Sequence, residues 1–509
     1  MRRYYKYSLL WLIGLLSVAA LTRFYNLAER PYDHDEAIHG WFSYNIANGN
    51  TYKFDPVYHG PLLYYTNGAL FRVLGASDFT ARFLPALASV GLIFLCFTLR
   101  REMGRWGWIA ASLFIIVSPS LTYYGRFLGH DDYVLFFTLA IPSCGTALLR
   151  TGRPVFFYLL GLVMGLFICT KACFYIHSAI FISFIFLGLL MDSFSPAYSR
   201  EGVLRLVKGL WECNRIHIIF SFACFGLVYV CLYSSFFLNL NGISEGIFKM
   251  LGYWSGQQLN PRLPGPLHYY LFRLVFHEPV FYFALAALFY AGRRKVSPFF
   301  LFLAFWSISA FTIYSFAQEK VPWLTVHIVL PMCLLAGMYF QVLLDRSPRR
   351  WMPLLLGAFI LFWSARENMW LCFTSPPDTP HLLKYMSTSL EAKKTAKYVE
   401  KLDTKKGQIF IVGDPLWVFA WYLKDKEVTY LLPKGWQKTA QVVITGEKFL
   451  KDGEGFARDV RMLRFWWLPD YAELFGHEFV KYFLLHKRPE SIGITRFAIY
   501  SRTTDKYGQ

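Results

Sequence analysis

The sequence predicts a mainly α-helical protein that crosses a membrane many times and carries a small α/β domain at its C-terminal end. Of its 509 residues, 55% are hydrophobic and 19% are aromatic, which is too apolar for a soluble enzyme of this size. Apolar runs of near membrane-spanning length recur from residue 7 to about residue 370. Beyond that point the composition becomes mixed and charged.

The apolar runs predict roughly eleven membrane spans. In chain order these are residues 7–27, 82–99, 106–122, 132–149, 155–170, 172–191, 216–238, 279–291, 298–317, 323–344 and 351–370. The runs at 155–170 and 279–291 are short, and they would also fit broken helices.

The basic residues predict the orientation of these spans. The formal net charge is +19, and Lys and Arg cluster in alternate loops, for example at 100–105, 150–153, 293–295 and 346–350. Cytoplasmic loops are enriched in these residues. We therefore expect a multi-pass protein of the inner (plasma) membrane, with a cytoplasmic N-terminus and an extracytoplasmic C-terminal domain. The charge is explained by orientation, so no nucleic-acid partner is expected.

The predicted domain boundary lies at residue 370. Residues 1–370 form the membrane domain and residues 371–509 the extracytoplasmic α/β domain. The first external loop, 28–81, is too long for a simple connection and is expected to contain helices starting near Asp35 and near Pro61. The C-terminal domain is expected to have strands at 408–414, 428–432, 441–445 and 494–500, and a helix at 417–423.

The strongest candidate site is the acidic cluster Asp33-His34-Asp35-Glu36, which follows the first span. Charges beside lipid are costly and usually functional. Acids at a helix N-terminus are also favoured by the helix dipole, so a capping role is equally possible. Asp35 and His39 are spaced i,i+4 and would share a helix face, where a carboxylate and an imidazole can bind a divalent metal or form a general base.

A second cluster lies between the third and fourth spans, on the same predicted side. It contains Arg126, Asp131 and Asp132. Either acid could merely cap the fourth span. Arg126, five residues upstream of Asp131, instead suits the binding of an anionic substrate at the same end of these spans.

Two weaker signals lie in other external loops. Lys320 could simply pair with Glu319, or it could hold a phosphate at the membrane surface. His59, in Tyr58-His59-Gly60-Pro61, is more often a packed interfacial histidine than a ligand.

Together these groups suit the transfer of a group from a lipid-phosphate carrier to a hydroxyl acceptor. A carboxylate would remove the acceptor proton, and basic groups or a metal would stabilise the departing phosphate. The alternative is a transporter or flippase-associated protein that handles lipid-linked sugars without catalysis. Transporters usually place ionisable residues near the midplane and often contain inverted repeats. Here the acids gather at one face, and the sequence shows no repeat, which favours the enzyme.

At these residues the chain resembles the GT-C glycosyltransferases. Within them it is similar to the protein mannosyltransferase and lipid A aminoarabinose transferase group. The runs Asp33-His34-Asp35-Glu36-Ala37-Ile38-His39, Tyr58-His59-Gly60-Pro61 and Glu319-Lys320-Val321-Pro322-Trp323-Leu324 are most similar to a bacterial and archaeal branch described as flippase-activity-associated. The resemblance covers about residues 1–370 and, more weakly, the tail.

The resemblance implies an inverting sugar transfer from a polyprenyl-phosphate donor to a lipid, glycan or protein acceptor. Asp35 would be the catalytic base, with Glu36 beside it, and Asp131 would be the acid of the second loop. The implied substrate-binding residues are Tyr58, His59, Arg126, Asp132, Glu319 and Lys320, of which Lys320 would contact the donor phosphate. Some relatives use a divalent metal (Mg, Mn, Ca or Zn), for which Asp35, His39 and Asp131 are the expected ligands.

Overall fold

The computed structural model describes residues 2–190, 200–376, 379, 381–404, 408–449, 455–466 and 493–502. It divides the chain into two compact units. The helical unit comprises Met1–Leu27, Asn50–Asn67 and Arg82–Thr374, and the mixed unit comprises Ala28–Gly49, Gly68–Ala81 and Ser375–Gln509. Two pieces of the segment 28–81 therefore group with the C-terminal residues, whereas the predicted division ran at residue 370.

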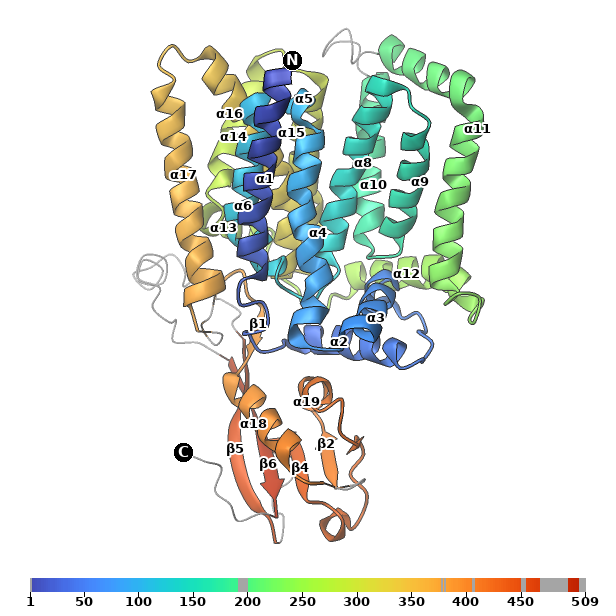
Figure 1. The fold of residues 1–509 in the computed structure, drawn as a ribbon, viewed down its shortest axis with the longest axis vertical. Coiled ribbons are helices and arrows are strands. Elements are labelled where there is room, and N and C mark those ends of the chain that lie inside the picture. Colours follow the sequence, from blue (N-terminus) through green and yellow to red (C-terminus); the bar gives the residue numbers. More distant parts are fainter. Residues whose placement is uncertain are drawn as a thin grey trace. The chain divides into compact units, whose positions relative to one another are not determined.

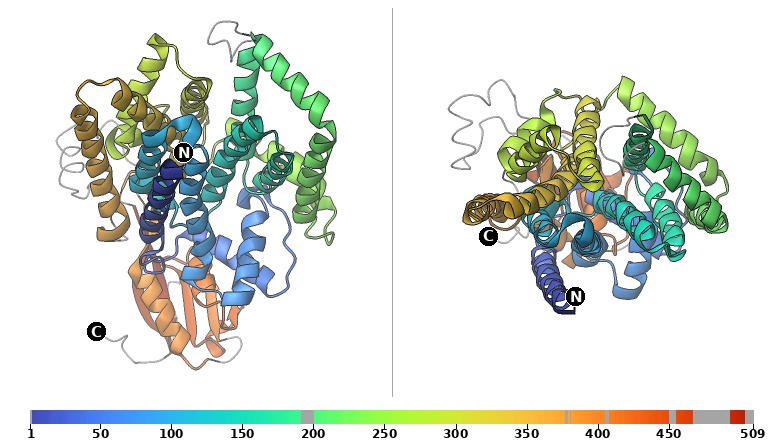
Figure 2. Two further views of the ribbon diagram at one scale, coloured as in Figure 1. Left: turned by 45° about the horizontal axis from the view of Figure 1, so that its top comes forward. Right: turned by 90° about the horizontal axis from the view of Figure 1, so that it is seen from above.

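The helical unit is built from long helices that run side by side (Figure 1), seen from above in the right view of Figure 2. Its helices are α1 (Arg2–Phe24), α4 (Asp78–Thr98), α5 (Arg100–Met103), α6 (Arg105–Val117), α7 (Pro119–Tyr124), α8 (Asp131–Thr151), α9 (Val155–Ile168), α10 (Cys173–Leu190), α11 (Arg200–Tyr233), α12 (Asn241–Leu259), α13 (Tyr269–His277), α14 (Val280–Arg293), α15 (Pro298–Phe316), α16 (Thr325–Arg346) and α17 (Trp351–Met369). Helix α4 begins, and α3 (Leu62–Leu74) ends, in the mixed unit.

Many of these helices can cross a membrane. Among the described residues, seven helices are long and apolar enough, or eight if the pair α13 and α14, bent by 108°, forms one span. Helices α6, α9 and α17 also lie at predicted spans, but α6 and α9 are shorter. The multi-pass architecture is thus confirmed and the number eleven is not. Residue 191, at the end of one predicted span, lies outside the described residues.

Small residues and a buried arginine fix the centre of the helical unit. Helices α6 and α16 pack so closely that a Cβ added to Gly337 would lie 2.5 Å from the Gly107 carbonyl oxygen, as expected where small residues bring membrane helices together. Arg23 donates to the carbonyl oxygens of Ile115 and Ile116, each at 2.9 Å. A helix leaves its last carbonyls without helical partners, so Arg23 caps α6 and fixes the chain that leads toward α8.

The mixed unit contains a six-stranded sheet in the order β1-β5-β6-β4-β2-β3. Its strands are β1 (Met386–Thr388), β2 (Ile409–Val412), β3 (Val428–Thr429), β4 (Val442–Gly446), β5 (Ala457–Trp466) and β6 (Gly493–Ser501), with β2 parallel to β3 and β4 and the remaining pairs antiparallel. Helices α18 (Leu390–Lys401) and α19 (Leu416–Tyr422) bury apolar side chains against the sheet, and α2 (His34–Ala47) packs on α19.

The predicted α/β character of this unit is confirmed. The helix at 417–423 and the strands at 408–414, 428–432, 441–445 and 494–500 correspond to α19, β2, β3, β4 and β6. The sequence did not predict β1, β5 or α18. Strand β5 is largely half-exposed and contains Arg458, Asp459, Arg461 and Arg464. Its sequence therefore lacks the regular alternation of apolar and polar residues that predicts a strand.

Candidate functional site

The helical unit contains a cavity of about 620 Å³, within the size range of small-molecule sites. Its walls come from α10, α12, the end of α15 and the 3₁₀ turn Pro322–Leu324. Most of the lining is apolar or aromatic, and Trp254 and Trp323 are its largest side chains. The charged or titratable side chains of the lining include His59, Lys171, Arg262 and Glu319. The cavity therefore combines an apolar wall with a few ionic groups.

Lys171 is the most buried of these cations. It lies between α9 and α10 with 5% of its surface exposed, and its Nζ is 2.9 and 3.2 Å from the two carboxylate oxygens of Asp131. Burial alone would lower the pKa of Lys171, but the charge of Asp131 outweighs this effect and raises that pKa. Lys171 therefore remains protonated while it lines the cavity.

Asp131 is at the centre of a buried polar network. His327 Nε2 of α16 lies 2.9 Å from Asp131 Oδ1, and Cys173 Sγ lies 3.8 Å from the same imidazole nitrogen. Two side chains thus already contact the carboxylate that the sequence put forward as a catalytic acid and metal ligand. Asp132, its neighbour, is also buried. Of these two acids, Asp131 is the one that forms an ion pair with Lys171.

Sequence reasoning missed Lys171, His327 and Arg262. Lys171 had a recognisable signal, because it is a single charge between the apolar runs 155–170 and 172–191. His327 lies inside an apolar run, and Arg262 is in a long loop. Their roles depend on partners distant in sequence.

The two cations that the sequence did propose have other partners. Arg126 donates to the carbonyl oxygens of Thr22, Arg23 and Asn26, at 3.0, 3.2 and 3.3 Å, and so holds the end of α1. Lys320 donates to three carbonyl oxygens near the end of α15. Neither side chain lines the cavity.

Glu319 and His59 do line the cavity. Glu319 pairs with Arg262 at 2.7 Å. The His59 ring is stacked on Trp254, with ring centroids 5.8 Å apart. The neighbouring Tyr58 accepts a hydrogen bond from Tyr64 through its carbonyl oxygen.

The motif Tyr58-His59-Gly60-Pro61 is anchored beside Lys171. The Gly60 amide donates to the Thr170 carbonyl oxygen at 2.6 Å. A Cβ at Gly60 would lie 2.2 Å from the Cys169 carbonyl oxygen, so only glycine permits this approach. The motif and the turn that carries Lys171 are thereby held together.

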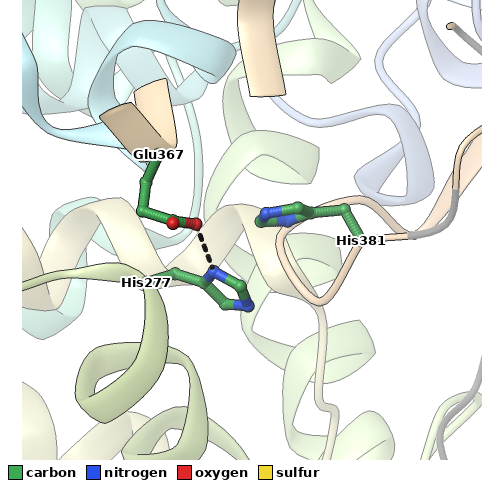
Figure 3. A group of neighbouring side chains, drawn as sticks. All are labelled: His277, Glu367 and His381. Carbon is green, nitrogen blue, oxygen red and sulfur yellow. Dashed lines mark hydrogen bonds and ion pairs between the residues drawn. The ribbon is translucent and has the colours of Figure 1, made fainter. Parts of the chain in front are cut away.

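A second buried acid–imidazole pair lies outside the cavity lining. His277, at the end of α13, has its Nδ1 3.3 Å from Glu367 Oε2 of α17 (Figure 3), and both side chains are buried. The third side chain drawn, His381, belongs to the mixed unit. The pair ties α13, where the chain bends before α14, to α17.

In the mixed unit, the first acidic cluster starts helix α2. Asp33 is the N-cap residue and forms a capping box with Glu36, which satisfies backbone N–H groups of the first turn. The Glu36 carboxylate also pairs with Arg30 at 3.0 Å. The capping interpretation is therefore confirmed for Asp33 and Glu36. Asp35 is half-buried and takes no part in the capping box.

We expect Asp33 to make the stability of α2 pH-dependent. Burial, together with the charges of Asp35 and Glu36, raises the pKa of Asp33 from 3.8 to about 8. The folded state then binds more protons than the unfolded state between these values, so stability falls as pH rises from about 4 to about 8. Asp33→Asn should keep the cap and remove this pH dependence. Asp33→Ala should remove both, so that it is about 1 kcal/mol less stable than Asp33→Asn at every pH.

Hydrogen exchange of α2 amides, corrected for the intrinsic pH dependence of exchange, measures both effects. A slope that persists unchanged in Asp33→Asn would assign the pH dependence to another group.

Comparison with known proteins identifies solved structures with the same fold. No family model and no curated protein sequence matches the chain. The crystal structure of ArnT from Cupriavidus metallidurans bound to undecaprenyl phosphate has 14% sequence identity and a TM-score of 0.60, covering 97% of this chain and 98% of that chain. The apo structure of the same protein has 13% identity and a TM-score of 0.59, covering 86% and 93%.

An archaeal structure is similar to a comparable degree. The Archaeoglobus fulgidus oligosaccharyltransferase, in complex with Zn and sulfate, has 12% identity and a TM-score of 0.56, covering 86% of this chain and 68% of that chain. At such low identities the similarity concerns the fold.

Proposed function

The chain has the fold of the GT-C membrane glycosyltransferases, and from this premise we propose that it is an inverting glycosyltransferase. The donor is a polyprenyl-phosphate sugar and the acceptor a lipid, glycan or protein at the outer face of the membrane. The observation that carries the proposal is the apolar cavity with the buried, protonated Lys171 in its wall. The solved structure of ArnT with undecaprenyl phosphate supports a polyprenyl-linked donor.

The cavity has the chemistry that a lipid phosphate requires. Met250, Leu251 and Leu259 of α12 offer an apolar wall for isoprenoid units. Lys171 offers an ammonium group that can bind the phosphate. Charge-assisted hydrogen bonds of this kind are stronger than hydrogen bonds between neutral groups. Asp131 keeps that ammonium charged until the phosphate arrives.

The reaction that we propose is a direct displacement at the anomeric carbon. Asp35 takes the proton of the acceptor hydroxyl, whose oxygen forms the new glycosidic bond as the bond to the donor phosphate oxygen breaks. General bases of this kind contribute about 10²–10⁴-fold to the rate. Lys171 stabilises the negative charge that develops on the leaving polyprenyl phosphate. Attack opposite to the leaving group inverts the configuration of the sugar.

A divalent cation would fit α2 better than Asp131. Asp35 and His39 are spaced i,i+4 on this helix, and a carboxylate with an imidazole suits Mn or Zn. The Asp131 carboxylate is already engaged by Lys171 and His327. A cation bound there would act as a Lewis acid and stabilise negative charge.

The test is sugar transfer from a radiolabelled polyprenyl-phosphate sugar by the full-length protein in proteoliposomes, with membrane lipid extract supplying acceptors. We expect cleavage of the sugar–phosphate bond. Movement of intact labelled lipid between leaflets without cleavage would instead identify a transporter.

Trp254→Ala should weaken donor binding. Trp254 is a major part of the cavity wall and supports His59 through ring stacking. Loss of these contacts is expected to raise the donor KM about tenfold, which corresponds to about 1.4 kcal/mol. Trp211→Ala is the matched control, because Trp211 is exposed on α11. Equal donor KM values in both variants would exclude the cavity as the donor site.

A further inference from the structure

Two segments of the helical unit, each a helix end with the loop that follows it, are bound together beside the cavity. We call residues 258–265 and 314–321 the clasp. The Lys320 amide donates to the Leu263 carbonyl oxygen at 2.8 Å, and the Gln318 amide donates to the Gln258 side-chain oxygen at 3.1 Å. Pro264 and Glu319 form an isolated β-bridge. The Arg262–Glu319 ion pair connects the two segments a further time.

Lys320 closes the clasp from within. With 4% of its surface exposed, it donates through Nζ to the carbonyl oxygens of Tyr314 at 3.3 Å, Ser315 at 2.5 Å and Ala317. Carbonyls at a helix C-terminus lack helical partners, and a cation there is stabilised by the helix dipole. The ammonium of Lys320 therefore caps α15.

The stem of the same side chain holds the opposite loop. A Cβ added to Gly265 would lie 2.7 Å from Lys320 Cγ. On its other side, the Lys320 ammonium lies 5.9 Å from the centre of the Tyr270 ring. One side chain thus joins the end of α15 to the loop before α13.

The clasp forms part of the cavity wall. Gln258, Arg262, Ala317 and Glu319 belong to it and line the cavity, whereas Lys320 does not. We propose that Lys320 is a positioning residue, whose ammonium holds the clasp closed and thereby fixes the Arg262–Glu319 side of the donor cavity. This role differs from the donor-phosphate contact that the resemblance implied. The link to donor binding rests on the proposed function, and the closed clasp itself does not.

The charge of this ammonium is sensitive to pH. Burial lowers the pKa of Lys320 from 10.5 to about 8. Among the described residues, the charged and titratable groups around it are Glu319 with its partner Arg262, and the phenol of Tyr270. Tyr314 contacts the ammonium through its backbone carbonyl oxygen. An amine that has lost its proton donates fewer and weaker hydrogen bonds to the three carbonyls. The clasp should therefore loosen as pH rises through about 8.

Hydrogen exchange tests the clasp without any substrate. We compare the wild type with Lys320→Met, which keeps most of the stem, and Lys320→Arg, which keeps the charge. Peptides covering 258–268 and 317–321 should exchange at least tenfold faster in Lys320→Met at pH 7, with α8 unchanged. The wild type should show the same change between pH 7 and pH 9, after correction for intrinsic exchange, and Lys320→Arg should not. Unchanged exchange in Lys320→Met would overturn the proposal.

Gly265→Ala provides an independent variant that leaves Lys320 in place. Its methyl group must displace the lysine stem, so we expect the same faster exchange at pH 7. Because both changes open one clasp, the double variant Gly265→Ala/Lys320→Met should exchange no faster than either single variant. Additive effects would show that the two residues act separately.

Donor kinetics then separate this proposal from the proposed function. Lys320→Met should raise the donor KM about tenfold and leave kcat within about twofold, since Lys320 lies outside the reacting groups. A looser clasp in a protein that transfers no sugar would reject the transferase and keep the clasp. Normal transfer with unchanged exchange and unchanged donor KM in Lys320→Met would reject the clasp and keep the transferase.

Discussion

Lys171→Met is expected to abolish sugar transfer and to lower the free energy of unfolding of the helical unit. The variant removes the cation proposed to stabilise the leaving phosphate. It also leaves the buried Asp131 carboxylate with only His327 as a polar contact among the described residues. Removing one partner of a buried ion pair costs about 3–5 kcal/mol. Thermal unfolding in detergent and the transfer assay measure the two effects separately.

A double variant distinguishes the catalytic role of Lys171 from its structural role. In Lys171→Met/Asp131→Asn both charges are absent, and replacing a whole buried pair by neutral groups is often neutral for stability. We expect stability to return to near that of the wild type while transfer stays absent. Recovery of transfer together with stability would mean that Lys171 only supports the fold.

Asp35→Asn is expected to lower the rate of sugar transfer by about 10²–10⁴-fold, because an amide cannot accept the acceptor proton. The stability of the mixed unit should not change. Helix α2 is capped by Asp33 and Glu36, and Asp35 takes no part in that capping box. The measurements are single-turnover transfer from the labelled donor and hydrogen exchange of α2.

Asp33→Asn is the matched control for this experiment, since it makes the same chemical change two residues earlier and retains a good N-cap. It should keep transfer within about threefold of the wild type if Asp35 is the general base. Full activity in Asp35→Asn would exclude it as the base. Loss of folded protein in that variant would instead assign Asp35 a structural role.

The parts of this protein that the sequence predicted correctly depend on local patterns. Apolar runs predicted most of the membrane helices, because the length of an apolar run is set by the thickness of the bilayer. Short β-branched runs predicted β2, β4 and β6. The span number was not confirmed, because helices such as α9 are short and α13 bends by 108° into α14.

The same reasoning predicted local capping but not the hydrogen-bond partners of individual side chains. It placed the start of α2 at the cluster Asp33-His34-Asp35-Glu36, and capping is a local property of the chain. It also proposed Lys320 and Arg126 as substrate contacts. In the structure both side chains donate to backbone carbonyl oxygens, and their contact with substrate stays a prediction. No local pattern carries that information.

By itself, the sequence determined the membrane architecture, the α/β character of the mixed unit and the capped acidic helix. Only the tertiary structure decided which cations line the cavity. Lys171 pairs with Asp131, 40 residues away in the sequence, and Asp131 contacts His327, 196 residues away. Arg262 meets Glu319 across 57 residues. Ion pairs of this kind form where packed helices and loops bring distant charges together, and their energies depend on how far each charge is buried.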